Sequence, residues 1–123
     1  MCFPFGSGGT SSYRLWYELF DSDVEICPVH LPGRESRYGE EPCLDANILI
    51  NDLLPELLPL LNCPSIFFGY SLGTALAYKT IVECSKVIRK TQQPPTKVGG
   101  CCVIPKYSFD SINEFVFLYC YLS

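Results

Sequence analysis

The sequence predicts an α/β fold in which a parallel sheet of about four strands carries helices on both faces. Short apolar runs alternate along the chain with longer stretches of helical spacing, and loops rich in Gly, Pro and Ser separate them. Alternating strands and helices of this kind form parallel βαβ crossovers. At 123 residues, the chain is long enough for one domain and too short for two.

Each element is expected from its own local pattern. Ser11 or Ser12 should cap the first helix, which should end near Asp21. Pro55 should break the second helix, because proline removes a backbone N–H donor. The predicted elements are a strand at 2–5, a helix at 12–20, a strand at 24–32, a helix at 44–61, a strand at 65–71, a helix at 72–89 and a strand at 97–105.

Composition argues against several classes of function. The net charge is −4 and no basic stripe is present, which disfavours binding to nucleic acid. The eight cysteines include no C-x-x-C pair, and no metal site is predicted. Because no secretory signal is recognisable, we expect reduced thiols and a cytoplasmic protein. The longest apolar run, at 115–122, is too short to span a membrane as a helix.

The stretch "FFGYSLG" at 67–73 contains the pattern G-x-S-x-G around Ser71. In a nucleophile elbow the serine sits at a sharp turn between a buried strand and a helix, and both are predicted here. Gly69 and Gly73 fit a turn that brings backbones too close for a Cβ. The N–H of Leu72, at the start of the helix, could then stabilise an oxyanion. The alternative is a Gly-Ser-Gly turn without chemistry.

A second loop, "FPFGSGG" at 3–9, follows the first predicted strand. Its small residues leave backbone N–H groups free to serve as a second oxyanion donor, although a plain glycine-rich loop would look the same. The loop has neither the Lys-Ser/Thr end of a P-loop nor the full spacing of a dinucleotide fingerprint, so phosphate binding is not predicted.

Three blocks in order, "CFPFGSGG", "HLPGRESR" at 30–37 and "FFGYSLG", resemble the type II thioesterases of the α/β-hydrolase fold, including oleoyl-acyl-carrier-protein hydrolases. The resemblance implies release of acyl groups from carrier-protein phosphopantetheine in fatty-acid, polyketide or non-ribosomal peptide synthesis. The partner would be an acyl carrier protein or a carrier domain of a synthase, and no cofactor of the protein's own is implied.

By this resemblance Ser71 is the nucleophile, and the backbone N–H groups of Phe5 and Leu72 form the oxyanion hole. The nucleophile elbow is completed by Gly69, Tyr70 and Gly73. Tyr70 stands where most type II members place a histidine, and related thioesterase domains accept an aromatic residue there.

The general base of the family is not found among these residues. In this fold the acid and then the histidine follow the serine, yet the one histidine, His30, precedes it. His30 is interpreted as a partly buried loop residue, and Asp110 is a weak candidate for a former triad acid. We therefore expect the isolated chain to be inactive, or to retain at best a trace of activity.

The resemblance covers about residues 2–83 and predicts a partial α/β-hydrolase domain at 1–105 with a divergent tail at 106–123. The C-terminal half of the family fold would be missing from this chain, which we expect to be truncated, and the uncovered sheet should promote self-association. Two other functions stay open: another serine esterase or lipase of the same fold, or a non-catalytic fragment that at most binds a carrier protein.

Overall fold

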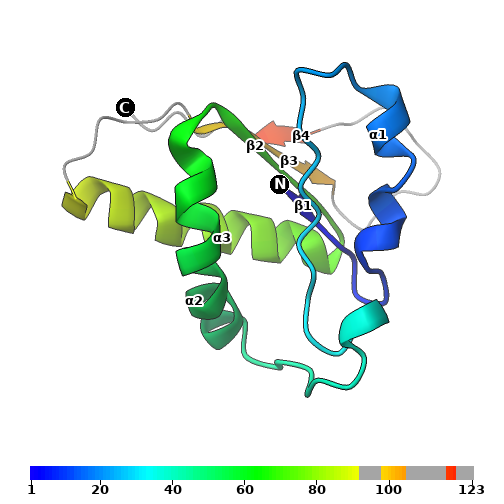
Figure 1. The fold of residues 1–123 in the computed structure, drawn as a ribbon. Coiled ribbons are helices and arrows are strands. Elements are labelled where there is room, and N and C mark those ends of the chain that lie inside the picture. The colour runs from blue at the N-terminus through cyan, green and yellow to red at the C-terminus, as the bar shows by residue number, and fades with distance from the viewer. Residues whose placement is uncertain (92–97, 105–115, 119–123) are drawn as a thin grey trace.

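The computed structural model describes residues 1–91, 98–104 and 116–118, and its sheet carries helices on both faces (Figure 1). The strands are β1 (Cys2–Phe3), β2 (Ser65–Tyr70), β3 (Val98–Ile104) and β4 (Val116–Leu118). The helices are the 3-10 turns η1 (Thr10–Tyr13), η2 (Glu35–Arg37) and η3 (Leu58–Asn62) and the α-helices α1 (Trp16–Leu19), α2 (Ala46–Leu57) and α3 (Leu72–Thr91).

The sheet has the strand order β1-β2-β3-β4. β1 pairs parallel with β2, and β2 pairs parallel with β3, which confirms the predicted parallel sheet, whereas β4 pairs antiparallel with β3. Three of the predicted strands therefore form where the apolar runs predicted them. β4 lies within 106–123, the segment predicted to be a divergent tail. The end of the thioesterase-like domain at residue 105 stays a prediction.

The prediction of a strand at 24–32 is wrong, because this segment does not form a regular strand. The segment runs beside β1 and makes one isolated parallel bridge between Cys2 and Pro28 (Figure 1). Two hydrogen bonds hold it there: the N–H of Cys2 donates to the Cys27 carbonyl, and the N–H of Val29 donates to the Cys2 carbonyl, both at 2.8 Å. β1 offers only two residues to pair with, and Pro4, which follows it, has no N–H to donate back to this segment.

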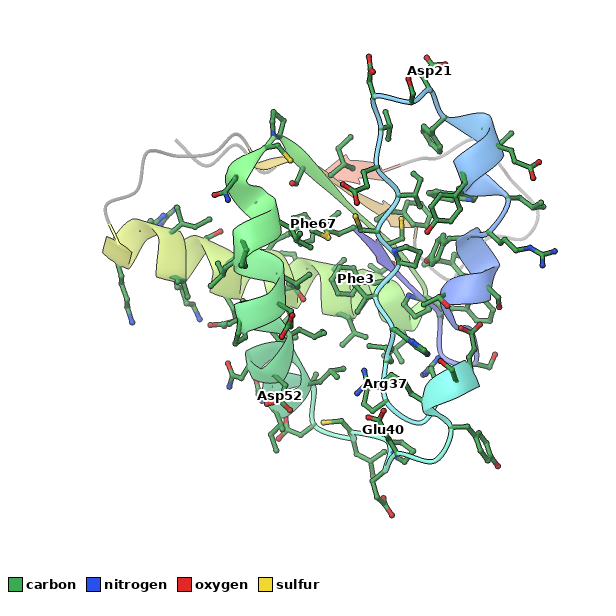
Figure 2. All side chains as sticks on the ribbon, viewed as in Figure 1. Phe3, Asp21, Arg37, Glu40, Asp52 and Phe67 are labelled. Atoms are coloured by element: carbon green, nitrogen blue, oxygen red, sulfur yellow. The ribbon has the colours of Figure 1, made fainter. Side chains whose placement is uncertain are left out.

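Side chains alternate between the two faces of the sheet. Phe3 and Phe67 are fully buried on one face, where their rings lie 6.2 Å apart (Figure 2). That face is covered by α2 and α3, whose buried side chains complete the main core: Leu49, Leu57, Leu76, Ala77, Ile81 and Cys84. The opposite face is covered by a smaller cluster of Cys2, Tyr13 and Ile26, with Trp16 and Phe68 packed against it.

The predicted helix at 12–20 is shorter and interrupted in the structure, where it becomes η1 followed by the single turn α1. Neither predicted serine caps it. The residue preceding η1 is Gly9, which has no side chain to supply a cap. The first N–H groups of η1 instead donate to the carboxylate of Glu35, which comes from a distant segment.

The helix predicted at 44–61 begins at Ala46 after an Asp45 cap, whose carboxylate accepts from the Asn47 N–H at 2.7 Å. It does not break at Pro55. The α-helix continues to Leu57 because the Leu58 N–H still donates to Leu54. Pro59 then has no N–H for the next α-helical bond, and the chain tightens into η3.

The helix predicted at 72–89 is confirmed as α3, which begins directly after β2. Among the described residues, no helix combines the length and the apolar character required to cross a bilayer.

Candidate active site

Ser71 lies at the corner where β2 ends and α3 begins, and it is half-buried. Its φ is +54°, in the left-handed region that residues with a Cβ seldom adopt. A residue keeps this conformation only where the surrounding structure holds it, and residues of this kind cluster at functional sites. The predicted strand–serine–helix corner is therefore present.

The two glycines of the pattern are required by close approach of backbones. A Cβ on Gly69 would overlap the carbonyl of Gly73 and the amide nitrogen of Thr74. A Cβ on Gly73 would overlap the carbonyl of Phe3, at the end of β1. Thr74 adds a hydrogen bond from its hydroxyl to the Gly69 carbonyl at 3.0 Å. The corner is thus packed directly against the neighbouring strand.

The loop that follows β1 lies beside this corner. The ring of Phe5 meets the ring of Tyr70 edge to face, with their centroids 6.0 Å apart. A turn is closed by the Gly8 N–H, which donates to the Phe5 carbonyl at 3.0 Å. Among the described residues, the N–H groups of Phe5 and Leu72 have no hydrogen-bond partner. Both predicted oxyanion donors are therefore available to a ligand.

The charge distribution along α3 also suits an anion at the corner. The helix has 20 residues and carries no acidic side chain in its first turn, whereas Arg89 and Lys90 occupy its last turn. The positive end of the helix dipole therefore lies at Leu72, without a carboxylate to neutralise it.

The contacts of His30 lie within its own segment, with Arg34 and Arg37. Its Nε2 lies 3.1 Å from the carbonyl of Arg34, and its backbone carbonyl accepts from Arg37 Nη1 at 2.6 Å. Among the described residues, no side chain is hydrogen-bonded to the Ser71 hydroxyl. The predicted loop role of His30 agrees with this geometry, and Asp110 lies outside the described residues.

A cavity of about 450 Å³ opens beside the corner. Gly6 and Ser7 of the β1 loop and Leu72 of α3 form part of its wall, next in sequence to Phe5 and Ser71. Most of the remaining wall is apolar and comes from three segments: Leu31 and Pro32, Leu44 and Leu49, and Leu76. Arg34 also contributes to the wall, and Ser71 itself does not, so an apolar chain in this cavity would lie against Leu72, which follows the serine in sequence.

Sequence reasoning did not identify the residues that hold the β1 loop. The guanidinium of Arg34 donates from Nη1 to the carbonyls of Phe5 at 2.7 Å and Gly8 at 2.5 Å. Glu35 accepts from the N–H groups of Thr10 and Ser11, at 2.9 and 3.0 Å. The sequence does show an arginine followed by a glutamate directly after a Pro-Gly turn. No local pattern, however, indicates which backbone groups these two side chains contact.

Comparison with protein families gives one match that covers most of the chain. A family model described as "Thioesterase domain" matches residues 1–94. This range contains the corner at Ser71, the β1 loop and the segment that bears Arg34 and Glu35.

Curated relatives include the gramicidin S biosynthesis protein GrsT of Aneurinibacillus migulanus, which is 33% identical over 89 residues, or 72% of this chain and 33% of that protein. They also include the medium-chain S-acyl fatty acid synthase thioesterase of Homo sapiens, which is 33% identical over 95 residues, or 76% of this chain and 34% of that protein. The chain therefore spans about a third of the length of these relatives.

Solved structures give the same result. The RedJ thioesterase of the prodiginine pathway in Streptomyces coelicolor has a TM-score of 0.63 and 33% identity, over 76% of this chain and 34% of that one. The type II thioesterase BorB from the borrelidin biosynthetic cluster has a TM-score of 0.63 and 27% identity, over 74% and 36%. These neighbours have the α/β-hydrolase fold, which confirms the fold expected from the resemblance.

Proposed function

Because the chain belongs to the thioesterase family, we propose that it carries the nucleophile and oxyanion hole of an enzyme that releases acyl groups from carrier-protein phosphopantetheine. One observation carries the proposal: Ser71 occupies a left-handed turn between β2 and α3, beside two N–H groups that lack partners among the described residues. A non-catalytic Gly-Ser-Gly turn would not need the serine to adopt this conformation, because a glycine would adopt it at lower cost.

In the proposed reaction Ser71 Oγ attacks the carbonyl carbon of the thioester. The oxyanion of the tetrahedral intermediate accepts from the N–H groups of Phe5 and Leu72, which are unoccupied beforehand and need no rearrangement. Collapse breaks the carbon–sulfur bond, and the pantetheine thiol leaves with the proton taken from Ser71. Water then attacks the ester formed on Ser71, releases the carboxylic acid and restores the hydroxyl.

The proton transfers need a base, for which the family uses a histidine. The ring of His30 faces the Arg34 carbonyl, and it is the single histidine of the sequence. We therefore propose that these 123 residues by themselves turn over at most a trace of substrate. The serine and the oxyanion donors should still bind and orient a thioester.

The apolar cavity supports an acyl substrate. Its wall includes Leu72, which neighbours the nucleophile, and Leu49 and Leu76 from the two helices. Burial of each methylene of an acyl chain there would contribute about 0.8 kcal/mol. The names of the relatives place one in gramicidin S biosynthesis and the other with fatty acid synthase, and we propose an acyl carrier protein or a carrier domain as the partner of this chain.

A fluorophosphonate probe tests whether Ser71 is nucleophilic. We expect slow labelling of the parent chain, located at Ser71 by peptide mass spectrometry and absent from Ser71→Ala. Ser65→Ala provides a matched control, because Ser65 begins β2 and its hydroxyl donates to the Cys63 carbonyl at 3.0 Å. Labelling that survives in Ser71→Ala would contradict the assignment.

Substrate comparison separates the proposal from its alternatives. An acyl-thioesterase should cleave acyl-pantetheine thioesters faster than oxygen esters of the same acyl chain. A preference for oxygen esters would favour another serine esterase or lipase of the fold. Retention of an acyl carrier protein without labelling of Ser71 would favour a non-catalytic binding role.

A further inference from the structure

We propose that Arg34 and Glu35 are positioning residues for the oxyanion hole, acting together as a clamp on the loop 5–11 that carries the Phe5 N–H. The inference rests on the proposed function, since it assigns a role within that same site. It is carried by four backbone groups of the loop, each hydrogen-bonded to one of these two adjacent side chains.

Arg34 fixes the first end of the loop. The carbonyl of Phe5 accepts from Arg34 Nη1 and from the Gly8 N–H, so the peptide that follows Phe5 is held from two directions. The same Nη1 donates to the Gly8 carbonyl, which joins the two ends of the turn. On its other side Phe5 is held by its ring against Tyr70. Rotation of Phe5 away from the corner would break all of these contacts.

Glu35 fixes the second end. One carboxylate oxygen accepts from the N–H and hydroxyl of Thr10, and the other accepts from the N–H and hydroxyl of Ser11. Gly9 leaves the space for it, because a Cβ there would overlap the carboxyl group of Glu35. Four bonds to one exposed carboxylate lower the pKa of Glu35 to about 2, with Ser11 the largest cause, so the clamp is charged at neutral pH.

The charges are arranged to match the loop. A cation meets the carbonyl groups at one end, and an anion meets the N–H groups at the other, as each kind of backbone group requires. Both side chains come from one turn, which is closed by the Gly33 N–H donating to the Arg37 carbonyl at 3.0 Å. Arg37 is itself paired with Glu40 on the outer side of this turn (Figure 2).

The backbone at the clamp is strained in a way that fits this role. Glu35 has a φ of +47°, and apart from Ser71 no other described non-glycine residue has a positive φ. A strained residue persists only where its surroundings hold it in place. Here the left-handed turn lets two consecutive side chains reach opposite ends of the same loop. A residue that served solvation alone would not need this conformation.

The test compares conservative clamp variants with matched controls in the full chain. Arg34→Lys keeps the charge but loses the planar fork, and Glu35→Gln keeps the shape but loses the charge. Arg14→Lys and Glu41→Gln are the controls, because among the described residues neither side chain forms a hydrogen bond or ion pair. The amide resonances of Phe5 and Gly6 and the amide exchange rates of Gly8, Thr10 and Ser11 are measured by NMR.

Both clamp variants should shift the Phe5 and Gly6 resonances. Exchange should rise by about tenfold at Gly8 in Arg34→Lys, and at Thr10 and Ser11 in Glu35→Gln, while Ala77 and Ile81 in α3 keep their protection. Unchanged resonances and exchange in the loop would overturn the proposal. A uniform loss of protection that includes α3 would also overturn it, because that result indicates general stability instead of positioning.

Labelling of Ser71 by a fluorophosphonate provides the second readout. A displaced oxyanion donor should slow labelling by about tenfold to a hundredfold in Arg34→Ala. Millimolar guanidinium should restore much of that rate, and it should have no effect on Arg14→Ala. Slower labelling without this rescue would count against the clamp. If the parent chain is not labelled at all, the nucleophile assignment fails, and the NMR comparison still decides whether the clamp holds the loop.

Discussion

The two turns that meet at the carboxyl ends of β1 and β2 are held in place by different means. The turn at Ser71 is held by backbone packed against backbone: Gly69 against Gly73, and Gly73 against Phe3. The loop after β1 is held by side chains that arrive from residues 34 and 35. One turn depends on the absence of side-chain atoms, whereas the other depends on two charged groups distant in sequence.

These two ways of holding a turn predict different responses to substitution. A close backbone contact tolerates no added atom, because the carbonyl of Phe3 belongs to the sheet and cannot move aside. An exposed hydrogen-bonded loop can lose one bond and recover part of it from water. We therefore expect steric changes at the elbow to destabilise the fold, and polar changes at the loop to alter local order.

The largest effect is expected for Gly73→Ala. Its new Cβ would overlap the Phe3 carbonyl, and overpacking of this kind costs about 1–3 kcal/mol, more than the gain of up to about 1 kcal/mol from alanine in a helix. Urea unfolding should show the loss. Gly39→Ala is the control, since nothing lies within 4 Å of a Cβ there. Equal stability of the two variants would contradict a rigid elbow.

Strain at Ser71 should appear as a stability difference of about 1 kcal/mol between Ser71→Gly and Ser71→Ala. Both variants lack the hydroxyl, but only glycine adopts a φ of +54° without cost. Ser71→Gly should therefore melt higher than Ser71→Ala. Identical melting temperatures would show that the left-handed turn carries no strain.

A smaller loss, about 1 kcal/mol or less, is expected for Tyr13→Phe. The buried Tyr13 hydroxyl donates to the Phe3 carbonyl at 2.6 Å and ties η1 to the end of β1. Burial raises the pKa of Tyr13 to about 12, with a smaller contribution from Cys2, so the group stays a donor through the neutral range. Tyr17→Phe is the control, because Tyr17 is 57% exposed and should be neutral. Unfolding free energies measure both variants.

The smallest effect is a pH dependence of the loop. The pKa of Glu35 is lowered from 4.5 to about 2, so its contribution is fully present above pH 4.5 and is lost as pH falls toward 2. Amide exchange at Thr10 and Ser11, corrected for its intrinsic pH dependence, should rise across this window in the parent and stay flat in Glu35→Gln. A matching rise in both proteins would assign the effect to another carboxyl group.

Local patterns were enough to predict most of the structure around Ser71. The apolar run before Ser71, the helical spacing after it and the flanking glycines predicted β2, α3 and the corner between them. They succeed because an elbow is built from consecutive residues. The roles of Ser71, Phe5 and Leu72 stay a prediction, which the labelling experiment addresses.

Other segments could not be predicted locally. The stretch at 24–32 has the apolar character of a strand, yet the two-residue length of β1 and the missing N–H of Pro4 leave it a single bridge. The first helix was expected to cap itself, but its cap comes from Glu35. The second helix passes Pro55 because the Leu58 N–H restores the next bond. The first two outcomes depend on partners outside the segment, whereas the third depends on a bond within the helix that the presence of a proline does not by itself exclude.

The sequence by itself determined the α/β class, the positions of three strands and the serine corner, because hydrophobic period and glycine spacing act over a few residues. Only the tertiary structure decided what holds the loop 5–11. Arg34 and Glu35 reach that loop across 24 to 29 positions of the chain, and the directions of their side chains follow from a left-handed turn that no composition or period specifies.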